Sequence, residues 1–235
     1  SSFEFVLGLA RHTHTRLTNW GDSMARGEER AVTILLEGEG GIALDGLFVA
    51  SPEPGAGGVV IAPPHPLYGG SMDSPVVSEI AWACARAGLA SLRFNWRGVG
   101  ASGGTASGDA EHARADYAAA LAQLASTVPG RLLAAGYSFG AATAVRAAAE
   151  EPRVRGLILV APPPALLDRA ALAARPRDVL ILCGENDEIA PAAALEEIAR
   201  ELPCARFVKI EEADHFFGAG LADGGREITK WLGGE

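Results

Sequence analysis

The feature that most constrains the fold is an alternation, beginning near residue 30, of short aliphatic and β-branched runs with longer runs rich in alanine. The short runs predict about eight strands, at 31–38, 41–50, 58–63, 89–95, 131–137, 154–161, 178–184 and 205–210. Apolar residues recurring every three or four positions predict helices at 74–88, 108–127, 139–151, 191–203 and 224–233. This alternation is typical of an α/β fold, a mostly parallel sheet with helices on both faces.

The first two strand segments are close enough in sequence to pair as an antiparallel edge hairpin, and helical crossovers join the others. The 235 residues suit one large domain, which we place at 30–235 after an N-terminal arm at 1–29. That arm could cover a site, mediate contacts in a homodimer or be disordered. Ligands of such sheets bind at the carboxyl ends of the strands, so functional residues are expected in the loops that follow them.

Charge and hydropathy argue against several classes of partner. The formal net charge is −9, from 29 acidic and 20 basic residues, and no run of lysines or arginines forms a phosphate-binding stripe. Nucleic acid and anionic membrane surfaces are therefore not expected partners. No segment has about eighteen consecutive apolar residues, and the first residues lack a basic leader and a cleavage site. We expect neither a membrane span nor a signal peptide.

Cysteine and histidine spacing does not favour a metal site. Cys84, Cys183 and Cys204 have no ligand spacing, and each lies in an apolar stretch, where a free cysteine packs as a small hydrophobe. Three free cysteines indicate a reducing cytoplasm as the expected location. His12 and His14 have H-x-H spacing but no acidic or cysteine partner nearby, which favours a solvated tail.

The stretch AAGYSFGAA, residues 134–142, holds Ser138 between two glycines. Ser138 directly follows a predicted strand and opens a predicted helix, so the turn between them must be tight. Such a turn strains the backbone at the serine, and the flanking Gly136 and Gly140 make it sterically accessible. The hydroxyl would be exposed at the top of the sheet, where the helix N-terminus favours developing negative charge. This context favours a nucleophile over a structural serine.

A serine hydroxyl needs a base to accept its proton, and the base needs an acid to orient it. The loop GENDEIAP, after the seventh predicted strand, offers Glu185, Asp187 and Glu188 as acids. The loop EEADHFFG, after the eighth, offers His215 as the base, with Asp214 as a further carboxylate nearby. Nucleophile, acid and base would then follow one another in the chain in that order.

These segments resemble the α/β-hydrolase family, over nearly all of the chain from about residue 30. GYSFG resembles the nucleophile elbow, ADHFF the histidine loop, and GENDEIAP the acid loop G-[DE]-x-D-x-x-x-P, which implies Asp187 as the acid. APPHPLYGGSMDSPVV and FNWRGVGASGG are similar to segments of small lidless bacterial members, related to the dienelactone hydrolase-like and acyl-ester hydrolase branches. Dienelactone hydrolases proper use a cysteine nucleophile, whereas this chain has Ser138, so the resemblance does not imply that exact activity. Lids usually follow the sixth strand, where 162–177 leaves room for one short helix and no cap domain.

The resemblance implies an oxyanion hole with two backbone donors. One would be the N–H of Phe139, the residue after the nucleophile. The other should come from the loop after the third strand, where Pro66 has no N–H to donate. We therefore expect Leu67, with Tyr68 as the alternative. His65 occupies the position of the histidine in the family's HG loop and is expected to shape that loop, because the histidine after the last strand is the better-placed base.

Aromatic and basic residues flank the same loops. Tyr68, Trp96 and Phe216 are candidate substrate-binding residues, although aromatic residues at such positions could simply pack beneath the loops. Arg97 is expected to anchor its loop through a salt bridge in preference to binding substrate.

The segment GVGASG, residues 98–103, matches the dinucleotide-binding pattern G-x-G-x-x-G and follows a predicted strand. A true fingerprint has a helix beginning within the motif, whereas here the next helix is expected only near Gly108. The motif also follows the fourth strand and not the first, so a nucleotide is not an expected ligand.

The sequence thus predicts a serine hydrolase of carboxylic esters or thioesters, with an acyl-enzyme on Ser138, His215 as base and Asp187 orienting it. No metal or organic cofactor is required, and the expected partner is a small-molecule ester or acyl substrate. A site without a cap favours a small soluble ester or the exposed end of a larger molecule. Two alternatives stay open, namely hydrolysis of amide, peptide or C–C bonds at the same site, and a non-catalytic binding protein of the same fold.

Overall fold

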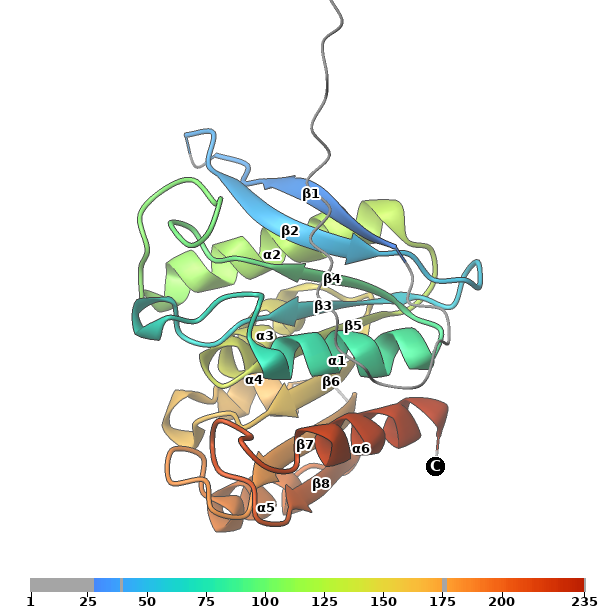
Figure 1. Cartoon of the computed structure of the whole chain (residues 1–235), viewed down its shortest axis with the longest axis vertical. Helices are drawn as coiled ribbons and strands as arrows, with labels where there is room; N and C mark the ends of the chain where they lie inside the picture. The colour runs from blue at the N-terminus through green and yellow to red at the C-terminus, as the bar shows by residue number, and fades with distance from the viewer. Residues whose placement is uncertain (1–27, 39, 175–176, 235) are drawn as a thin grey trace, which may run out of the picture.

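The computed structural model describes residues 28–38, 40–174 and 177–234, which form a sheet in the order β1-β2-β4-β3-β5-β6-β7-β8 (Figure 1). The strands are β1 (Glu29–Leu35), β2 (Ala43–Val49), β3 (Gly58–Ala62), β4 (Ala90–Phe94), β5 (Leu132–Tyr137), β6 (Val154–Val160), β7 (Asp178–Gly184) and β8 (Ala205–Ile210). The helices are α1 (Pro75–Arg86), α2 (Ala110–Thr127), α3 (Phe139–Glu150), α4 (Arg169–Ala173), α5 (Ala192–Arg200) and α6 (Leu221–Gly233), with 3-10 turns η1 (Pro66–Tyr68) and η2 (Pro164–Leu166).

The strand directions confirm the expected sheet. Strand β2 pairs antiparallel with both β1 and β4, whereas β3 to β8 are all parallel to one another. In the sheet β3 and β4 exchange places relative to their order in the chain, and β3 and β5 are the two central strands of the eight. The carboxyl ends of the parallel strands therefore converge on one end of the molecule, where the loops after β3, β5, β7 and β8 meet.

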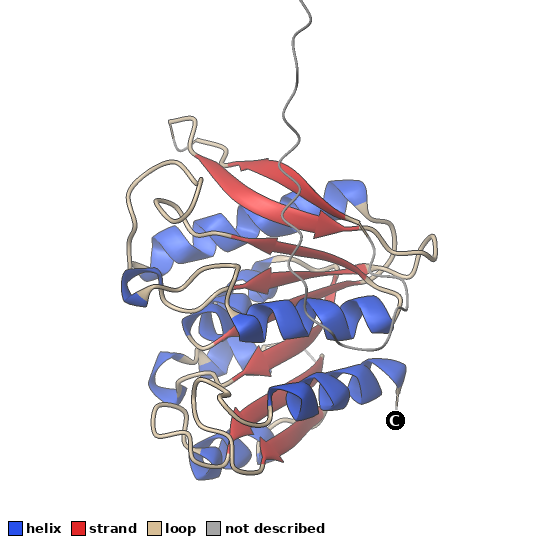
Figure 2. Ribbon diagram, viewed as in Figure 1, coloured by secondary structure: helices blue, strands red, loops and turns tan. Residues whose placement is uncertain are grey.

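Helices cover both faces of the sheet, as the sequence pattern predicts. Helices α1 and α6 lie side by side on one face, and α2, α3, α4 and α5 cover the other (Figure 2). Every residue of β3, β4 and β5 is buried, which is why these strands read as continuous apolar runs and not as alternating patterns. Only residues 161–177 separate β6 from β7, and their described part holds η2 and α4, so the absence of a cap domain is confirmed.

Helix α6 begins three residues earlier than the sequence indicates. It starts at Leu221, after Gly220 in a left-handed conformation, and Gly224 and Gly225 lie inside it as buried residues. The pair of glycines looks like a helix boundary in the sequence, but a Cβ atom at Gly225 would lie 1.8 Å from Oε1 of Glu79 on α1. A side chain at Gly225 would therefore have to displace the Glu79 side chain that packs over it.

The cysteines only partly match the expectation that all three pack as small hydrophobes. Cys84 and Cys183 are buried, and burial raises the pKa of each thiol to about 12, so both stay protonated and unreactive at neutral pH. Cys204 is exposed, which corrects the expectation for that residue. Its apolar surroundings in sequence belong to the short connection between α5 and β8 and do not bury it.

Two further expectations concern the start of the chain and the membrane. The arm at 1–29 falls almost wholly outside the described residues, and so do His12 and His14. Within the described ranges, no helix is long and apolar enough to cross a membrane.

Candidate active site

Ser138 lies at the sharp turn between β5 and α3. Its backbone has φ 55° and ψ −120°, a conformation that residues with a side chain rarely adopt. The turn is fixed from the neighbouring strand, because the Ser138 N–H donates to the carbonyl of Val160 at the end of β6, at 2.8 Å. The strain expected of a nucleophile elbow is thus present at this serine.

The two glycines beside Ser138 supply space. Neither has a positive φ. A Cβ on Gly136 would lie 2.3 Å from the carbonyl carbon of Gly140, and a Cβ on Gly140 would lie 2.4 Å from the carbonyl oxygen of Pro63. Any side chain at either position would push α3 away from β5 or from the loop after β3. The glycines therefore hold the serine and that loop close together.

The structure brings Ser138, His215 and Asp187 together. Nε2 of His215 lies 3.0 Å from Oγ of Ser138, and its Nδ1 lies 2.8 and 3.0 Å from the two carboxylate oxygens of Asp187. All three residues are buried, although they come from loops after β5, β7 and β8. With the carboxylate on one side and the hydroxyl on the other, the geometry fits a ring that carries its proton on Nδ1 and accepts from the serine at Nε2.

The carboxylates near His215 have different partners. Glu185 pairs with Lys209 at 2.8 Å, and Asp214 accepts from the backbone N–H of Phe216 at 3.0 Å. Of the acids considered from the sequence, Asp187 is the one in contact with the imidazole. It is the residue that the acid-loop motif selects.

Asp187 is held as an anion. Burial acts to raise the pKa of its carboxyl, but the hydrogen bond with His215 and those from two backbone N–H groups outweigh burial. The two amides are those of Ala190, at 2.7 Å, and Ile189, at 2.9 Å, in the turn that follows. The net result is a pKa below the ordinary value, so the carboxylate stays charged and can stabilise a positive imidazolium.

Tyr137 is a site residue that the sequence analysis did not single out. It is the last residue of β5, and its hydroxyl donates to the backbone carbonyl of His215 at 2.8 Å. Its ring also contacts the imidazole at a tilt of 35°, with 5.5 Å between the ring centroids. Burial and the charge of Asp187 raise the pKa of the phenol, so it remains a donor at neutral pH. The only signal in the sequence is an aromatic residue immediately before the serine.

The two expected oxyanion donors differ in their present bonds. The N–H of Phe139 belongs to the first turn of α3 and has no hydrogen-bond partner among the described residues. The N–H of Leu67 donates to Nδ1 of His65 at 3.2 Å, and the N–H of the alternative, Tyr68, donates to the His65 carbonyl at 3.1 Å. A side-chain acceptor can rotate away more readily than a main-chain carbonyl inside a turn. Leu67 therefore remains the better candidate of the two.

The position of Trp96 corrects the expectation that this residue contacts the substrate. Its side chain is only 1% exposed, and its Nε1–H donates to the carbonyls of Pro64 at 2.9 Å and Pro63 at 3.3 Å. The indole also meets the ring of Phe139 edge to face, with 5.7 Å between centroids. Trp96 therefore lies beneath the loop after β3 and fixes it against the start of α3, in the way that buried indole N–H groups usually find an acceptor.

The loop after β4 is anchored, and does not open a helix as a dinucleotide fingerprint would. Arg97 forms a buried ion pair with Asp116 at 2.7 Å, and its backbone N–H donates to the same carboxylate at 2.9 Å. This is the loop-anchoring role expected from the sequence. Helix α2 begins only at Ala110, with Asp109 as its N-cap, well after the segment 98–103.

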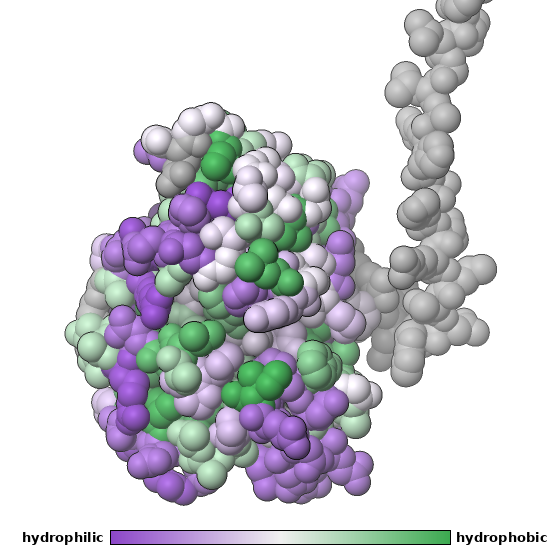
Figure 3. All heavy atoms as spheres, turned by 90° about the vertical axis from the view of Figure 1, so that its left-hand side faces the viewer, coloured by the Kyte–Doolittle hydropathy of each residue, from purple (hydrophilic) through white to green (hydrophobic). Residues whose placement is uncertain are grey.

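Tyr68 and Phe216, the other two candidate substrate contacts, are exposed at the site. Tyr68 is 87% exposed and packs against His65, with 4.7 Å between ring centroids. Phe216 is 70% exposed and meets the ring of His215 edge to face. The end of the molecule at which the parallel strands finish carries hydrophobic patches among hydrophilic residues (Figure 3). Both side chains are accessible to a ligand on that face.

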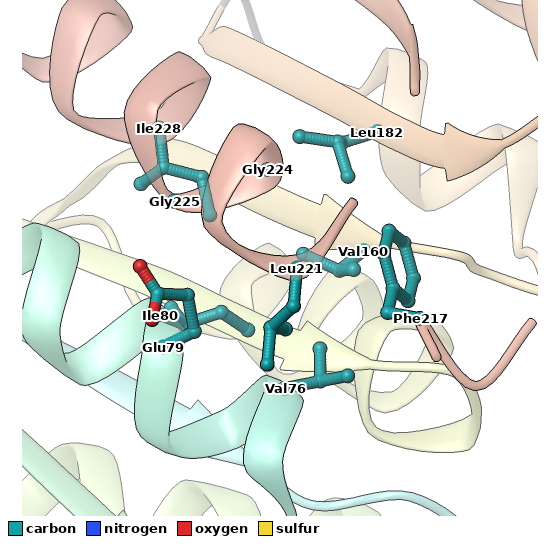
Figure 4. Close-up of a pocket in the computed structure, with 10 residues that line it drawn as sticks. All are labelled: Val76, Glu79, Ile80, Val160, Leu182, Phe217, Leu221, Gly224, Gly225 and Ile228. Carbon is teal, nitrogen blue, oxygen red and sulfur yellow. The ribbon is translucent and has the colours of Figure 1, made fainter. Parts of the chain in front are cut away.

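A small apolar cavity lies between α1 and α6, behind the histidine loop (Figure 4). Phe217 closes one end of it, and Val76, Leu182 and Leu221 line its walls. Its volume of about 10 Å³ leaves room for one water molecule at most. The cavity is a packing gap, too small to hold a substrate.

Comparison with known proteins finds similar sequences and similar folds. The family model described as "Serine aminopeptidase, S33" matches residues 67–174, a range that contains Ser138 but ends before Asp187 and His215. An uncharacterized protein of Rickettsia prowazekii (strain Madrid E) is 30% identical over 200 residues, covering 80% of this chain and 84% of that protein.

Solved structures extend the similarity over the whole domain. An α/β serine hydrolase homologue from Coxiella burnetii is 28% identical with a TM-score of 0.77, covering 90% of this chain and 100% of that one. A serine hydrolase without a lid from Xanthomonas campestris is 29% identical with a TM-score of 0.74, covering 89% and 95% of the two chains. Given this sheet order and these relatives, the chain belongs to the α/β-hydrolase superfamily, and family and fold indicate a hydrolase.

Proposed function

We propose that this protein hydrolyses carboxylic esters or thioesters through an acyl-enzyme on Ser138. The observation that carries the proposal is the continuous chain of contacts from Ser138 Oγ to His215 Nε2, at 3.0 Å, and from His215 Nδ1 to Asp187, at 2.8 Å. These distances lie within the hydrogen-bond reach that nucleophilic catalysis requires. The strained backbone at Ser138 presents the hydroxyl to this base.

In the proposed reaction, Ser138 Oγ attacks the acyl carbon while its proton passes to Nε2 of His215. The imidazolium is stabilised by the Asp187 carboxylate. The resulting oxyanion is bound by the N–H of Phe139 and by that of Leu67, whose bond to His65 must then yield. His215 protonates the leaving alcohol or thiol, and water attacks the acyl-enzyme by the same route in reverse.

A second candidate, hydrolysis of amides at the same site, is favoured by one observation. The family model that matches residues 67–174 is described as a serine aminopeptidase. The two reactions share the nucleophile and the base, and they differ in the leaving group that must be protonated. A matched ester and anilide of the same acyl group separates them, because an esterase cleaves only the ester at a measurable rate.

The test of the proposal is labelling with a fluorophosphonate, read by intact mass, on the wild type and on Ser138→Ala. One adduct on the wild type and none on the variant is the expected result. A wild type that stays unlabelled, where a reference serine esterase is fully labelled, would refute the proposal and favour a non-catalytic protein of the same fold.

A further inference from the structure

The loops around Ser138 carry almost all of the net charge of the chain. These loops are 63–74, 95–109, 161–168, 185–191 and 211–220, each of which follows a strand of the parallel sheet. They contain nine acidic residues, Asp73, Asp109, Asp168, Glu185, Asp187, Glu188, Glu211, Glu212 and Asp214. Their one basic residue is Arg97, so with neutral histidines their formal charge is −8, against −9 for the chain.

The basic residues on and beside these loops are held in ion pairs and leave most of the negative charge uncompensated. Arg97 is buried in its ion pair with Asp116. Arg169, the first residue of α4, is paired with Glu201. Lys209, near the end of β8, is paired with Glu185 and so neutralises one of the nine acids. An anionic ligand at Ser138 therefore meets no unpaired cation on these loops.

The same loops also expose apolar side chains. Seven large hydrophobic residues are exposed in the described part of the chain, and five of them lie on these loops. They are Leu67, Tyr68, Leu166, Ile189 and Phe216. They come from the loops after β3, β6, β7 and β8. These loops lie on the face that carries hydrophobic patches in Figure 3. Single exposed apolar residues are ordinary, but a concentration around one site indicates a binding surface.

From these two features we infer the substrate class of the site. The substrate is an ester with an apolar acyl or alkyl group whose other groups are uncharged or positively charged. The site discriminates against anionic esters and against thioesters of polyphosphorylated carriers. This inference rests on the proposed function, and it narrows the ester and thioester range given above.

Two physical effects at the loops around Ser138 underlie this inference, the burial of apolar groups of the substrate and the electrostatic repulsion of anions. When an apolar chain of the substrate packs against the exposed apolar side chains, each methylene group that is buried raises the affinity by up to about fourfold. A mouth lined by charge of one sign raises the local concentration of the opposite ion by about tenfold or more, and depletes ions of its own sign. Such effects fade with salt, because the screening length falls from about 30 Å at 0.01 M to a few ångströms near 0.5 M.

The test uses three p-nitrophenyl esters with one leaving group and a distant terminal group of different charge. They are p-nitrophenyl 6-(trimethylammonio)hexanoate, the uncharged 7,7-dimethyloctanoate of the same shape, and the anionic 6-sulfohexanoate. At 10 mM NaCl we expect kcat/KM of the cationic ester to exceed that of the anionic ester about tenfold. At 500 mM NaCl the ratio should fall below about threefold. An anionic ester cleaved equally fast, or a ratio unaffected by salt, would overturn the inference.

A pair of charge-reversal variants locates the effect. Asp73→Lys with Glu188→Lys changes two exposed acids on the loops around the site. Glu53→Lys with Asp178→Lys makes the same change in charge at the opposite end of the sheet, where β2 ends and β7 begins. Only the first variant should bring the low-salt ratio below about threefold. Equal loss in both variants would mean that total charge, and not these loops, sets the preference.

The outcomes separate this inference from the proposal on which it rests. Hydrolysis of all three esters with the anionic one preferred would leave a serine esterase and remove the substrate class. No hydrolysis together with no fluorophosphonate adduct would remove the proposed function, and the substrate class with it. Both variants are first checked for an unchanged melting temperature. Within each variant the cationic and anionic esters are then compared by the ratio of their kcat/KM values, which does not change when a substitution lowers the activity on all esters equally.

Discussion

The hydrogen bond from Tyr137 to His215 gives a sharp prediction, because one atom can be removed without disturbing the packing. Tyr137→Phe keeps the ring in contact with the imidazole and deletes only the hydroxyl, which lies 2.8 Å from the His215 carbonyl. The carbonyl then stays buried without its donor. Leaving such a group unsatisfied costs about 1–3 kcal/mol. For a chain of this length each kcal/mol lowers the melting temperature by about 2–4 °C, so we expect a fall of about 2–12 °C.

Activity should fall as well, because the histidine loop loses the contact that places the base. A displacement of a catalytic group by about 1 Å can cost up to a hundredfold. We expect kcat of Tyr137→Phe on a p-nitrophenyl ester to drop about tenfold with KM within twofold of the wild type. Tyr137 is a positioning residue, so the loss should appear in kcat alone.

A second buried tyrosine provides the matched control. The Tyr117 hydroxyl is 2.9 Å from the carbonyls of Val60 and Ala135, beneath β3 and β5 and away from the histidine loop. Tyr117→Phe should lower the melting temperature at least as much and leave kcat unchanged when measured well below the transition. The account would be refuted if Tyr137→Phe melted within about 1 °C of the wild type with the same kcat, or if both variants lost kcat equally.

Three other perturbations test the site. Gly140→Ala should cost about 3 kcal/mol in urea unfolding, because its Cβ would lie 2.4 Å from the Pro63 carbonyl oxygen; an unchanged midpoint would contradict the packing. Trp96→Phe should lower kcat and leave KM unchanged in steady-state kinetics, because the indole N–H donates to the Pro63 and Pro64 carbonyls and the side chain is not exposed. A raised KM with an unchanged kcat would instead indicate that Trp96 contacts the substrate. The pKa of Asp187 is depressed in the folded state, so its contribution to stability is present above about pH 4 and is lost as the pH falls further. The stability difference between wild type and Asp187→Asn should therefore shrink on acidification, and a constant difference would contradict the direction of the shift.

The sequence indicates the fold because the apolar periodicity is strong and the strands are separated by helices of ordinary length. It also places Ser138, Asp187 and His215 correctly after strands, since parallel strands bring such loops to one end. What it cannot indicate is which side of a loop an aromatic residue occupies. Trp96 and Tyr68 both flank strand ends, yet one is buried under the loop and the other is exposed upon it.

Contacts between segments that are distant in the chain cannot be predicted from local sequence patterns either. Tyr137 and His215 are separated by 78 positions, and no local pattern connects a phenol in a strand to a carbonyl in a later loop. The bond of the Leu67 N–H to His65 depends on one side-chain rotamer in a turn. The start of α6 is predicted at Gly224 instead of Leu221 for a related reason, since the contact of Gly225 with Glu79 on α1 becomes visible only once the two helices are packed together.

The most direct test of the account is to trap the acyl-enzyme. Wild type and Ser138→Ala are mixed with a p-nitrophenyl ester, quenched in acid within milliseconds and analysed by intact mass and peptide mapping. We predict one acyl group on the wild type, on the peptide that contains Ser138, formed at the rate of the p-nitrophenol burst, and none on the variant. Turnover without any acyl adduct, or an adduct on another residue, would contradict Ser138 as the nucleophile.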